Sequence, residues 1–367
     1  MKGYTIAVLG SHSALDVCRG AKDLGFKTLV IVKKGKVLKD RRDQTYAKYF
    51  KTQGDLGCVD EVIELDKFSD ILSEKVQKEL LKRNCIFVPH RSFEVYINDY
   101  DAIEKKFKVP IFGNRFLLKC EERGVKPNQY DLLDTAKIRY PKQFSDPKDI
   151  DRLCIVKVLE KERGFERAFF LVNDYREYKQ YTGHNLREGL FTQEQLNAAV
   201  IEEFIVGVQV NFNFFYSPVT NRLELIGTDT RRQTNLDGFL RLTAGHQQQI
   251  GGGITVTYEE AGHIAVTVLE SLLEDAFAIG ERFVKATQQL YNPGVIGPFG
   301  LQTMIIPGPP KKEIIVFDVS PRMPGSPGIF ATPYSGYLYG QNISMGKRVA
   351  MEIKMAIEKD QLGKVLT

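Results

Sequence analysis

The chain has 367 residues, of which 43% are hydrophobic and 26% are charged. This length suits two or three domains of roughly 150 residues each, and the apolar content is enough to fill their cores. The formal net charge of +5 suits anionic small molecules. Because that charge is mild and not clustered, it argues against a nucleic-acid-binding surface.

Five cysteines are spread along the chain without a CxxC motif or a Cys/His pairing. Their odd number and wide spacing predict neither a disulfide framework nor a zinc site, so we expect small buried thiols in a reducing compartment. No apolar run approaches the roughly 18 residues that suggest a membrane span, and the first residues lead directly into a strand pattern. We therefore expect a cytoplasmic protein without a membrane partner.

The first third of the chain alternates strand and helix patterns. An apolar run at 5–9 is followed by helical spacing through 14–24 and by a second strand pattern at 28–32. The alternation continues through residues 61–65, 69–82, 86–89 and 109–112. This order predicts an α/β part with an open, largely parallel sheet, whose ligand edge lies at the carboxyl ends of the strands.

The pattern changes near Pro141, after two helical segments at 115–123 and 128–136. Strand patterns with short turns then predict antiparallel sheets. These strands are expected at residues 154–159, 168–172, 208–216 and 223–228. Two helices, at 259–290 and 344–359, complete an α+β part.

Polar side chains gather at the predicted ligand edge of the parallel sheet. His12 and Ser13 lie where a strand leads into a helix, and the N–H groups of a helix start suit a phosphate. The alternative is simple N-capping by a serine. His90 and Ser92 follow another strand of the same sheet, and Asn114 follows the last one. We predict that these five residues line a substrate site.

A lysine and two carboxylates interrupt strand patterns of the second part. Lys157 either points outward from an alternating strand, which the pattern favours, or meets an anion such as a nucleotide phosphate. Glu202 and Glu203 are adjacent, so on a strand they face opposite sides. With Phe204 they offer a carboxylate beside an apolar slot, which suits a purine nucleoside. The alternative is a strand edge with one solvated glutamate.

Two apolar runs flank a turn at 307–312 and carry Gln302 and Asp318 at matched places. A hairpin would set these two side chains beside each other. Both are oxygen donors of the kind that Mg²⁺ takes together with phosphates and water. We predict a cation clamp for a nucleoside triphosphate, and the alternative is a solvent-facing aspartate at a strand end.

The segment 229–238 is dense in polar groups and follows an apolar strand. As a surface loop it would need no function. Placed near Asp318 and Arg322, the segment would bring Arg231 and Asn235 to the same site. Such cations and amides orient a carboxylate and stabilise negative charge in a transition state. We therefore predict catalytic roles for Arg231 and Arg322.

Together these segments resemble the ATP-grasp superfamily and, within it, the archaeal formate-dependent phosphoribosylaminoimidazole carboxamide ligase family. The similarity runs nearly end to end. Matching stretches include Leu-Gly-Ser-His-Ser at 9–13, Val-Pro-His at 88–90, Glu-Glu-Phe at 202–204 and Gly-Pro-Phe at 297–299. The resemblance implies a pre-ATP-grasp substrate domain at 1–125 and an ATP-grasp domain with antiparallel sheets at 126–367, with a lid at about 138–205.

The resemblance also implies an enzyme of purine biosynthesis that uses ATP and Mg²⁺ to activate formate as formyl phosphate. The formyl group then passes to the amine of aminoimidazole carboxamide ribonucleotide. By matching positions, the ribonucleotide would meet His12, Ser92 and Asn235, the ATP would meet Lys157 and Glu203, and the metal would meet Gln302 and Asp318. Family members assemble, which implies a homo-oligomer.

The sequence departs from the family pattern in four places, one of which is a polar residue replaced within residues 324–328. Residues 159–167 hold one glycine among three glutamates and three basic residues where the family has a glycine-rich lid, and we expect the basic residues to hold the phosphates. Asp318 replaces a metal-binding glutamate, and Arg91 replaces a glycine of the sheet edge. Two alternatives therefore stay open: an ATP-grasp ligase for another acid and amine, and a non-catalytic nucleotide-binding paralogue.

Overall fold

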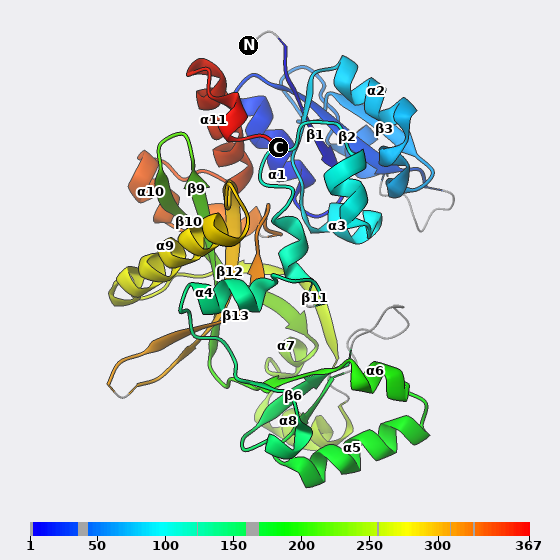
Figure 1. Cartoon of the computed structure of the whole chain (residues 1–367), viewed down its shortest axis with the longest axis vertical. Helices are drawn as coiled ribbons and strands as arrows, with labels where there is room; N and C mark the ends of the chain where they lie inside the picture. The colour runs from blue at the N-terminus through cyan, green and yellow to red at the C-terminus, as the bar shows by residue number, and fades with distance from the viewer. Residues whose placement is uncertain are drawn as a thin grey trace.

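The computed structural model describes the chain except residues 1–2, 36–42, 123, 159–168, 255–256, 309 and 326. The described residues form a parallel four-stranded sheet, an antiparallel five-stranded sheet and an antiparallel four-stranded sheet. The three sheets follow one another along the long axis of the molecule, with the parallel sheet at the top of the view (Figure 1). We call them the parallel, central and lid sheets.

The parallel sheet has the strand order β3-β2-β1-β4, and every neighbouring pair is parallel, as predicted. Its strands are β1 (Thr5–Leu9), β2 (Lys27–Lys33), β3 (Glu61–Leu65) and β4 (Cys85–Phe87). Helix α1 (Ala14–Asp23) packs on one face, and α2 (Glu74–Lys82) and α3 (Arg91–Ile97) pack on the other. Both faces are covered, which explains the unbroken apolar runs of β1 and β2.

The central sheet has the order β11-β10-β9-β12-β13. Its strands are β9 (Val208–Ser217), β10 (Arg222–Thr234), β11 (Tyr258–Ala265), β12 (Gly297–Ile306) and β13 (Glu313–Ser320). One face buries apolar side chains against α4 (Gln129–Thr135) and α9 (Leu273–Leu290). The opposite face carries polar side chains, and that division sets the place of the site.

One prediction in this region was wrong. The expected helix at 259–290 begins only at Leu273, because its first part is strand β11. Gly262, with φ of 147°, and Ile264 disfavour a helix there, whereas an open edge of β10 offers hydrogen bonds. Pairing with β11 also extends β10 through Thr234, so the polar segment 229–238 is strand up to that residue rather than a surface loop.

The lid sheet has the order β5-β8-β6-β7. Its strands are β5 (Gln143–Phe144), β6 (Cys154–Lys157), β7 (Phe169–Val172) and β8 (Val200–Glu203), and its helices are α5 (Tyr175–Arg187) and α6 (Gln193–Asn197). The predicted lid charges at 160–167 lie outside the described residues. The lid and domain boundaries therefore stay predictions.

Shorter elements connect these layers. They include α7 (Leu236–Phe239), α8 (Ala244–Ile250), α10 (Tyr334–Tyr339) and 3-10 turns at Phe68–Leu72, Leu118–Glu121, Pro147–Asp149, Gly251–Gly253, Glu270–Leu272, Pro327–Ala331 and Leu362–Lys364; single π turns lie at Thr45–Tyr49 and Ala102–Lys106. The helix expected at 115–123 is reduced to one of these turns, and the strand expected at 109–112 is reduced to isolated bridges. All five cysteines are buried and free, as predicted. In the described part of the chain, no helix is both long and apolar enough for a membrane span.

The last helix, α11 (Met345–Glu358), follows its N-cap Ser344, close to the start of the helix expected at 344–359, and returns to the N-terminal part of the chain. It packs against α1, and the C-terminus lies beside the parallel sheet (Figure 1). The crossing is close because both helices carry a glycine at the contact. A Cβ at Gly20 would collide with the backbone of Lys347, and one at Gly346 would collide with the backbone of Asp16.

This contact gives a stability prediction. Gly20→Ala should destabilise the protein by about 1–3 kcal/mol, because an added methyl group must force the α1 and α11 backbones apart. Gly183→Ala is the matched control, since Gly183 lies within α5 and its Cβ would meet nothing within 4 Å. That control should be neutral or stabilising by up to about 1 kcal/mol. Denaturant unfolding would measure both, and equal free energies of unfolding for the two variants would contradict the close crossing.

Candidate functional site

Two histidines meet at the ligand edge of the parallel sheet, as predicted. The rings of His12 and His90 stack with centroids 5.2 Å apart, and His90 Nε2 lies 3.0 Å from the carbonyl oxygen of Leu9. Burial, followed by the adjacent His90 and then by the more distant basic side chains, lowers the pKa of His12 to about 2, and burial lowers that of His90 to about 4. Both rings are therefore neutral near pH 7 and offer hydrogen bonds rather than charge.

The neighbouring hydroxyls tie this edge to the rest of the chain. Ser92 Oγ donates to Ser11 Oγ at 3.0 Å, and Ser13 Oγ donates to the carbonyl oxygen of Pro324 at 2.5 Å. Ser13 therefore does not cap α1 with its side chain. A Cβ on Gly325 would lie 2.7 Å from the ring of His12. The loop after β13 thus covers the edge of the parallel sheet.

Asn114 is buried in a different setting. Its amide nitrogen donates to the carbonyl oxygens of Tyr291 and Gly294, both at 2.9 Å, and its side-chain oxygen accepts from the backbone of Phe116. These bonds hold the turn that leads into β12. The predicted substrate contact of Asn114 stays a prediction, and the structure places it as a support of the fold.

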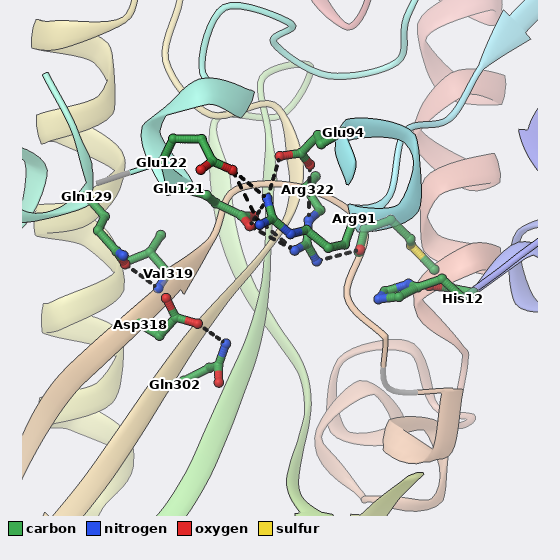
Figure 2. Close-up of polar contacts among 12 residues, drawn as sticks. His12, Arg91, Glu94, Glu121, Glu122, Gln129, Gln302, Asp318, Val319 and Arg322 are labelled. Atoms are coloured by element: carbon green, nitrogen blue, oxygen red, sulfur yellow. Dashed lines mark hydrogen bonds and ion pairs between the residues drawn. The ribbon is translucent and has the colours of Figure 1, made fainter. Parts of the chain in front are cut away.

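Four polar residues form a row across the polar face of the central sheet. Asp229 of β10 pairs with Asn211 of β9, Asn211 with Gln302 of β12, and Gln302 with Asp318 of β13. Gln302 Nε2 donates to Asp318 Oδ2 at 2.6 Å, and Figure 2 shows the two side chains facing each other. The predicted juxtaposition of Gln302 and Asp318 is confirmed.

This row has the chemistry of a Mg²⁺ site that is shared with a ligand. Gln302 and Asp318 each carry a side-chain oxygen, and the buried side-chain oxygen of Asn211 has no hydrogen-bond partner among the described residues. Among the described residues, no group of three His, Cys, Asp or Glu side chains forms a metal cluster. A hard cation would therefore need phosphate oxygens and water to complete its shell, as Mg²⁺ commonly does.

Asp229 organises a network that the sequence did not predict. Its carboxylate accepts hydrogen bonds from Asn211 at 2.9 Å, from Asn213 at 2.6 Å and from His263 Nδ1 at 2.6 Å. His263 Nε2 lies 3.1 Å from Glu260. Burial alone would lower the pKa of His263, but the hydrogen bonds and charges of Asp229 and Glu260 raise it to about 9. His263 is a cation near pH 7.

Arg231 and Asn235 are the two residues of the segment 229–238 for which we predict roles at the site, and they lie in different settings. Arg231 Nη1 is 3.6 Å from Glu260, and Arg231 pairs with His263 across the two strands. Asn235 accepts a hydrogen bond from the backbone of Thr257 at 3.1 Å, which holds the chain as it returns to β11. The roles predicted for Arg231 in catalysis and for Asn235 in substrate binding stay predictions.

Lys157 does not point outward, so the interpretation that the pattern favoured was wrong. Its ammonium group hydrogen-bonds to Glu202, which also accepts from the hydroxyl of Tyr130 at 3.1 Å. A buried carboxylate on the neighbouring strand β8 stabilises the lysine there. Glu203 faces the other side, as predicted, and pairs with Arg152 at 3.5 Å. Phe204 follows at the end of β8.

Arg322 turns away from Asp318 toward a buried group of carboxylates (Figure 2). Its guanidinium lies 3.4 Å from Glu94 and 3.0 Å from Glu121. Arg91 reaches the same two carboxylates, at 3.3 and 3.0 Å. Burial raises the pKa of Glu94 to about 8, although both arginines act against that rise. Arg91 thus forms ion pairs within the acidic group, and a catalytic role for Arg322 stays a prediction.

Comparison with known proteins places this chain in a family. A model described as a domain of unknown function (DUF1297) matches residues 177–367, and one described as a protein of unknown function (DUF1246) matches residues 6–144. A protein from Methanopyrus kandleri is 37% identical over all of this chain and 96% of its own length. One from Methanocaldococcus jannaschii is 38% identical over 99% of this chain and 95% of its own length. Both are named 5-formaminoimidazole-4-carboxamide-1-(beta)-D-ribofuranosyl 5'-monophosphate synthetase. The chain belongs to this synthetase family.

Solved structures agree with the family and with the predicted ATP-grasp fold. An IMP biosynthesis protein, PurP, from Thermococcus kodakaraensis is 28% identical, with a TM-score of 0.71 over 99% of this chain and 100% of that chain. An ADP complex of N5-carboxyaminoimidazole ribonucleotide synthetase is 11% identical, with a TM-score of 0.57 over 89% of this chain and 72% of that chain. At that identity the likeness shows the fold alone.

His263 makes the stability of the folded protein depend on pH. Its folded-state pKa of about 9 lies above the usual 6.5. The stabilisation is therefore complete below about pH 6.5 and is lost as the pH rises through about 9. The free energy of unfolding should fall across that window more steeply in the intact protein than in His263→Gln. Denaturant titrations between about pH 6 and 10 would test this, and parallel curves for the two proteins would contradict it.

Proposed function

We propose that the protein is an ATP- and Mg²⁺-dependent ligase that formylates aminoimidazole carboxamide ribonucleotide in purine biosynthesis. The full-length relatives are named for the product of that reaction. The observation that carries the proposal is the apposition of two surfaces. The histidine edge of the parallel sheet meets the loop that follows β13, and β13 carries the aspartate of the oxygen-donor pair.

The proposed reaction proceeds in two steps, phosphorylation of formate and transfer of the formyl group. A carboxylate oxygen of formate attacks the γ-phosphorus of ATP, and ADP leaves. The amine of the ribonucleotide then attacks the formyl carbon, inorganic phosphate leaves with its C–O bond electrons, and the amine loses a proton. Formate is a poor electrophile, so phosphorylation supplies the leaving group that the second step needs.

Different residues of the chain would bind the nucleotide and the metal. Lys157, in contact with Glu202, lies on the lid sheet and would meet the nucleotide phosphates, whereas Glu203 and Phe204 would meet the nucleoside. Gln302 and Asp318 would hold Mg²⁺. When bound, this ion neutralises charge on the transferring phosphoryl group.

The ribonucleotide is assigned to the opposite side of the site. The neutral rings of His12 and His90 supply hydrogen bonds without competing charge, and Ser92 and Asn235 supply further polar contacts. Ser13 orients His12, because its hydroxyl lies 2.7 Å from Nδ1 of that ring. We further propose a cytoplasmic homo-oligomer, and the five buried, free thiols suit such a reducing compartment.

The direct test is ADP release by the purified protein with ATP, Mg²⁺, formate and the ribonucleotide, each component being omitted in turn. We expect release that depends on all four, with formylated ribonucleotide as the product. Release that persists without formate but requires another carboxylate would assign a different acid. ATP binding without release under any of these conditions would contradict a catalytic role.

The metal assignment gives a second prediction. Asp318→Asn keeps the shape of the side chain and removes the negative charge, so turnover should fall about tenfold or more, with a higher Mg²⁺ requirement. Asp275→Asn is the control, because Asp275 lies on α9 and pairs only with Lys311 among the ion pairs of the described residues. Calorimetric titration of ATP with and without Mg²⁺ gives a readout that does not depend on turnover. Equal Mg²⁺ dependence in Asp318→Asn and the intact protein would contradict the clamp.

A further inference from the structure

One carboxylate of the chain lies between two cations on the edge strand of the central sheet. Glu260 Oε2 is 3.6 Å from Arg231 Nη1, and Glu260 Oε1 is 3.1 Å from His263 Nε2. The two cations belong to directly paired positions of β10 and β11. The side chain of Glu260 is 41% exposed, against 23% for Arg231 and 10% for His263. A partly solvated carboxylate thus caps two less exposed cations.

The cation at His263 is fixed in charge and in orientation. Asp229 is fully buried and accepts from His263 Nδ1, which directs Nε2 toward Glu260. Asn211 and Asn213 donate to the two oxygens of Asp229 and so hold that carboxylate in place. Because Asp229 already has its own partners, it is a positioning residue, and His263 and Arg231 are the groups that face an anion.

The charges of this group leave a place for one small anion. Asp229 balances one cation, and Glu260 balances the other. A small carboxylate that takes the place of Glu260 would meet the same two cations, Arg231 and His263, and their N–H donors. Replacing Glu260 by another carboxylate costs little free energy, because an ion pair of a half-exposed side chain contributes little to stability.

The group also faces the substrate edge. His263 and Arg231 both act on His12, where their positive charges help to keep the imidazole neutral. Asp229 belongs to the same cross-strand row as Gln302 and Asp318. An anion held by His263 and Arg231 therefore lies on the same polar face as the oxygen-donor pair, on the side toward the predicted ribonucleotide contact.

We infer that Arg231 and His263 form the binding site for the carboxylate substrate, and that Glu260 occupies this site until the substrate displaces it. This inference rests on the proposed function for the identity of the acid, which is formate. Formate has no side chain, so recognition must come from contacts to its carboxylate. The bridge that Glu260 makes between the two cations shows the contacts that such a carboxylate takes up.

The test is a pair of substitutions in the intact chain. Glu260→Gln keeps the shape and removes the competing charge, so the KM for formate should fall about two- to fivefold, the range expected for a half-exposed ion pair. His263→Gln removes a charged donor and should raise the KM for formate by about tenfold or more. The KM for ATP should stay within about twofold in both variants. Glu281→Gln, on the exposed side of α9, is the matched control and should change none of these values.

A binding measurement separates failure of this inference from failure of the proposed function. Titration with formate, and then with acetate, should shift the NMR signal of the His263 ring in the intact protein and saturate at lower concentration in Glu260→Gln. That result supports the site even if formate-dependent ADP release is absent. An unchanged or higher KM for formate in Glu260→Gln, or a His263 signal that neither acid shifts, would overturn the inference.

Discussion

The contact of α11 with both the parallel and the central sheet is the constraint on which the site depends. One side of α11 meets α1 at the paired glycines, and the other side reaches the central sheet through Arg348, which is 2% exposed. Arg348 hydrogen-bonds to Glu224 of β10 at 2.7 Å and to Glu352 one turn further along α11 at 2.9 Å. Breaking a buried ion pair leaves an uncompensated charge, so these contacts keep α11 from sliding along the central sheet. The edge of the parallel sheet is thereby fixed above the end of β13.

The charged groups of the site share one property, which is that each already has a partner within the chain. Lys157 meets Glu202, Arg322 meets Glu94 and Glu121, and His263 meets Asp229. Burial requires this, because an isolated buried charge costs several kcal/mol. Ligands of such a site must exchange partners rather than fill vacant charges. The affinity of the site for a ligand then depends on how strongly the chain's own carboxylate binds the same cation. An exposed glutamate is displaced more easily than a buried one.

Local sequence patterns predicted the structure correctly where the interacting residues lie near each other in the sequence. The alternation of strands and helices predicted the parallel sheet, and the turn at 307–312 predicted the pairing of Gln302 with Asp318, because a hairpin sets its own register. Ser344 and Asn128 marked helix starts that the structure confirms. The family resemblance added the ATP-grasp fold, which the solved structures confirm.

Partners distant in sequence were not predictable in this way. Lys157 was expected to point outward because nothing near it in sequence supplies its carboxylate, which comes 45 residues later. The pair of Asp229 and His263 joins residues 34 apart, and the second of them lay in a segment expected as a helix. One signal was present in the sequence: Asn211 and Asn213 alternate with phenylalanines, as on a strand with one polar and one buried face.

The central claim is that the histidine edge of the parallel sheet and the polar face of the central sheet bind different substrates of one reaction. Calorimetric titration of His12→Ala with the ribonucleotide and, separately, with ATP and Mg²⁺ tests it most directly. His184→Ala, on the exposed side of α5, is the control. The account predicts weaker binding of the ribonucleotide by His12→Ala with nearly unchanged binding of ATP. Unchanged affinity for the ribonucleotide, or an equal loss for both ligands, would contradict it.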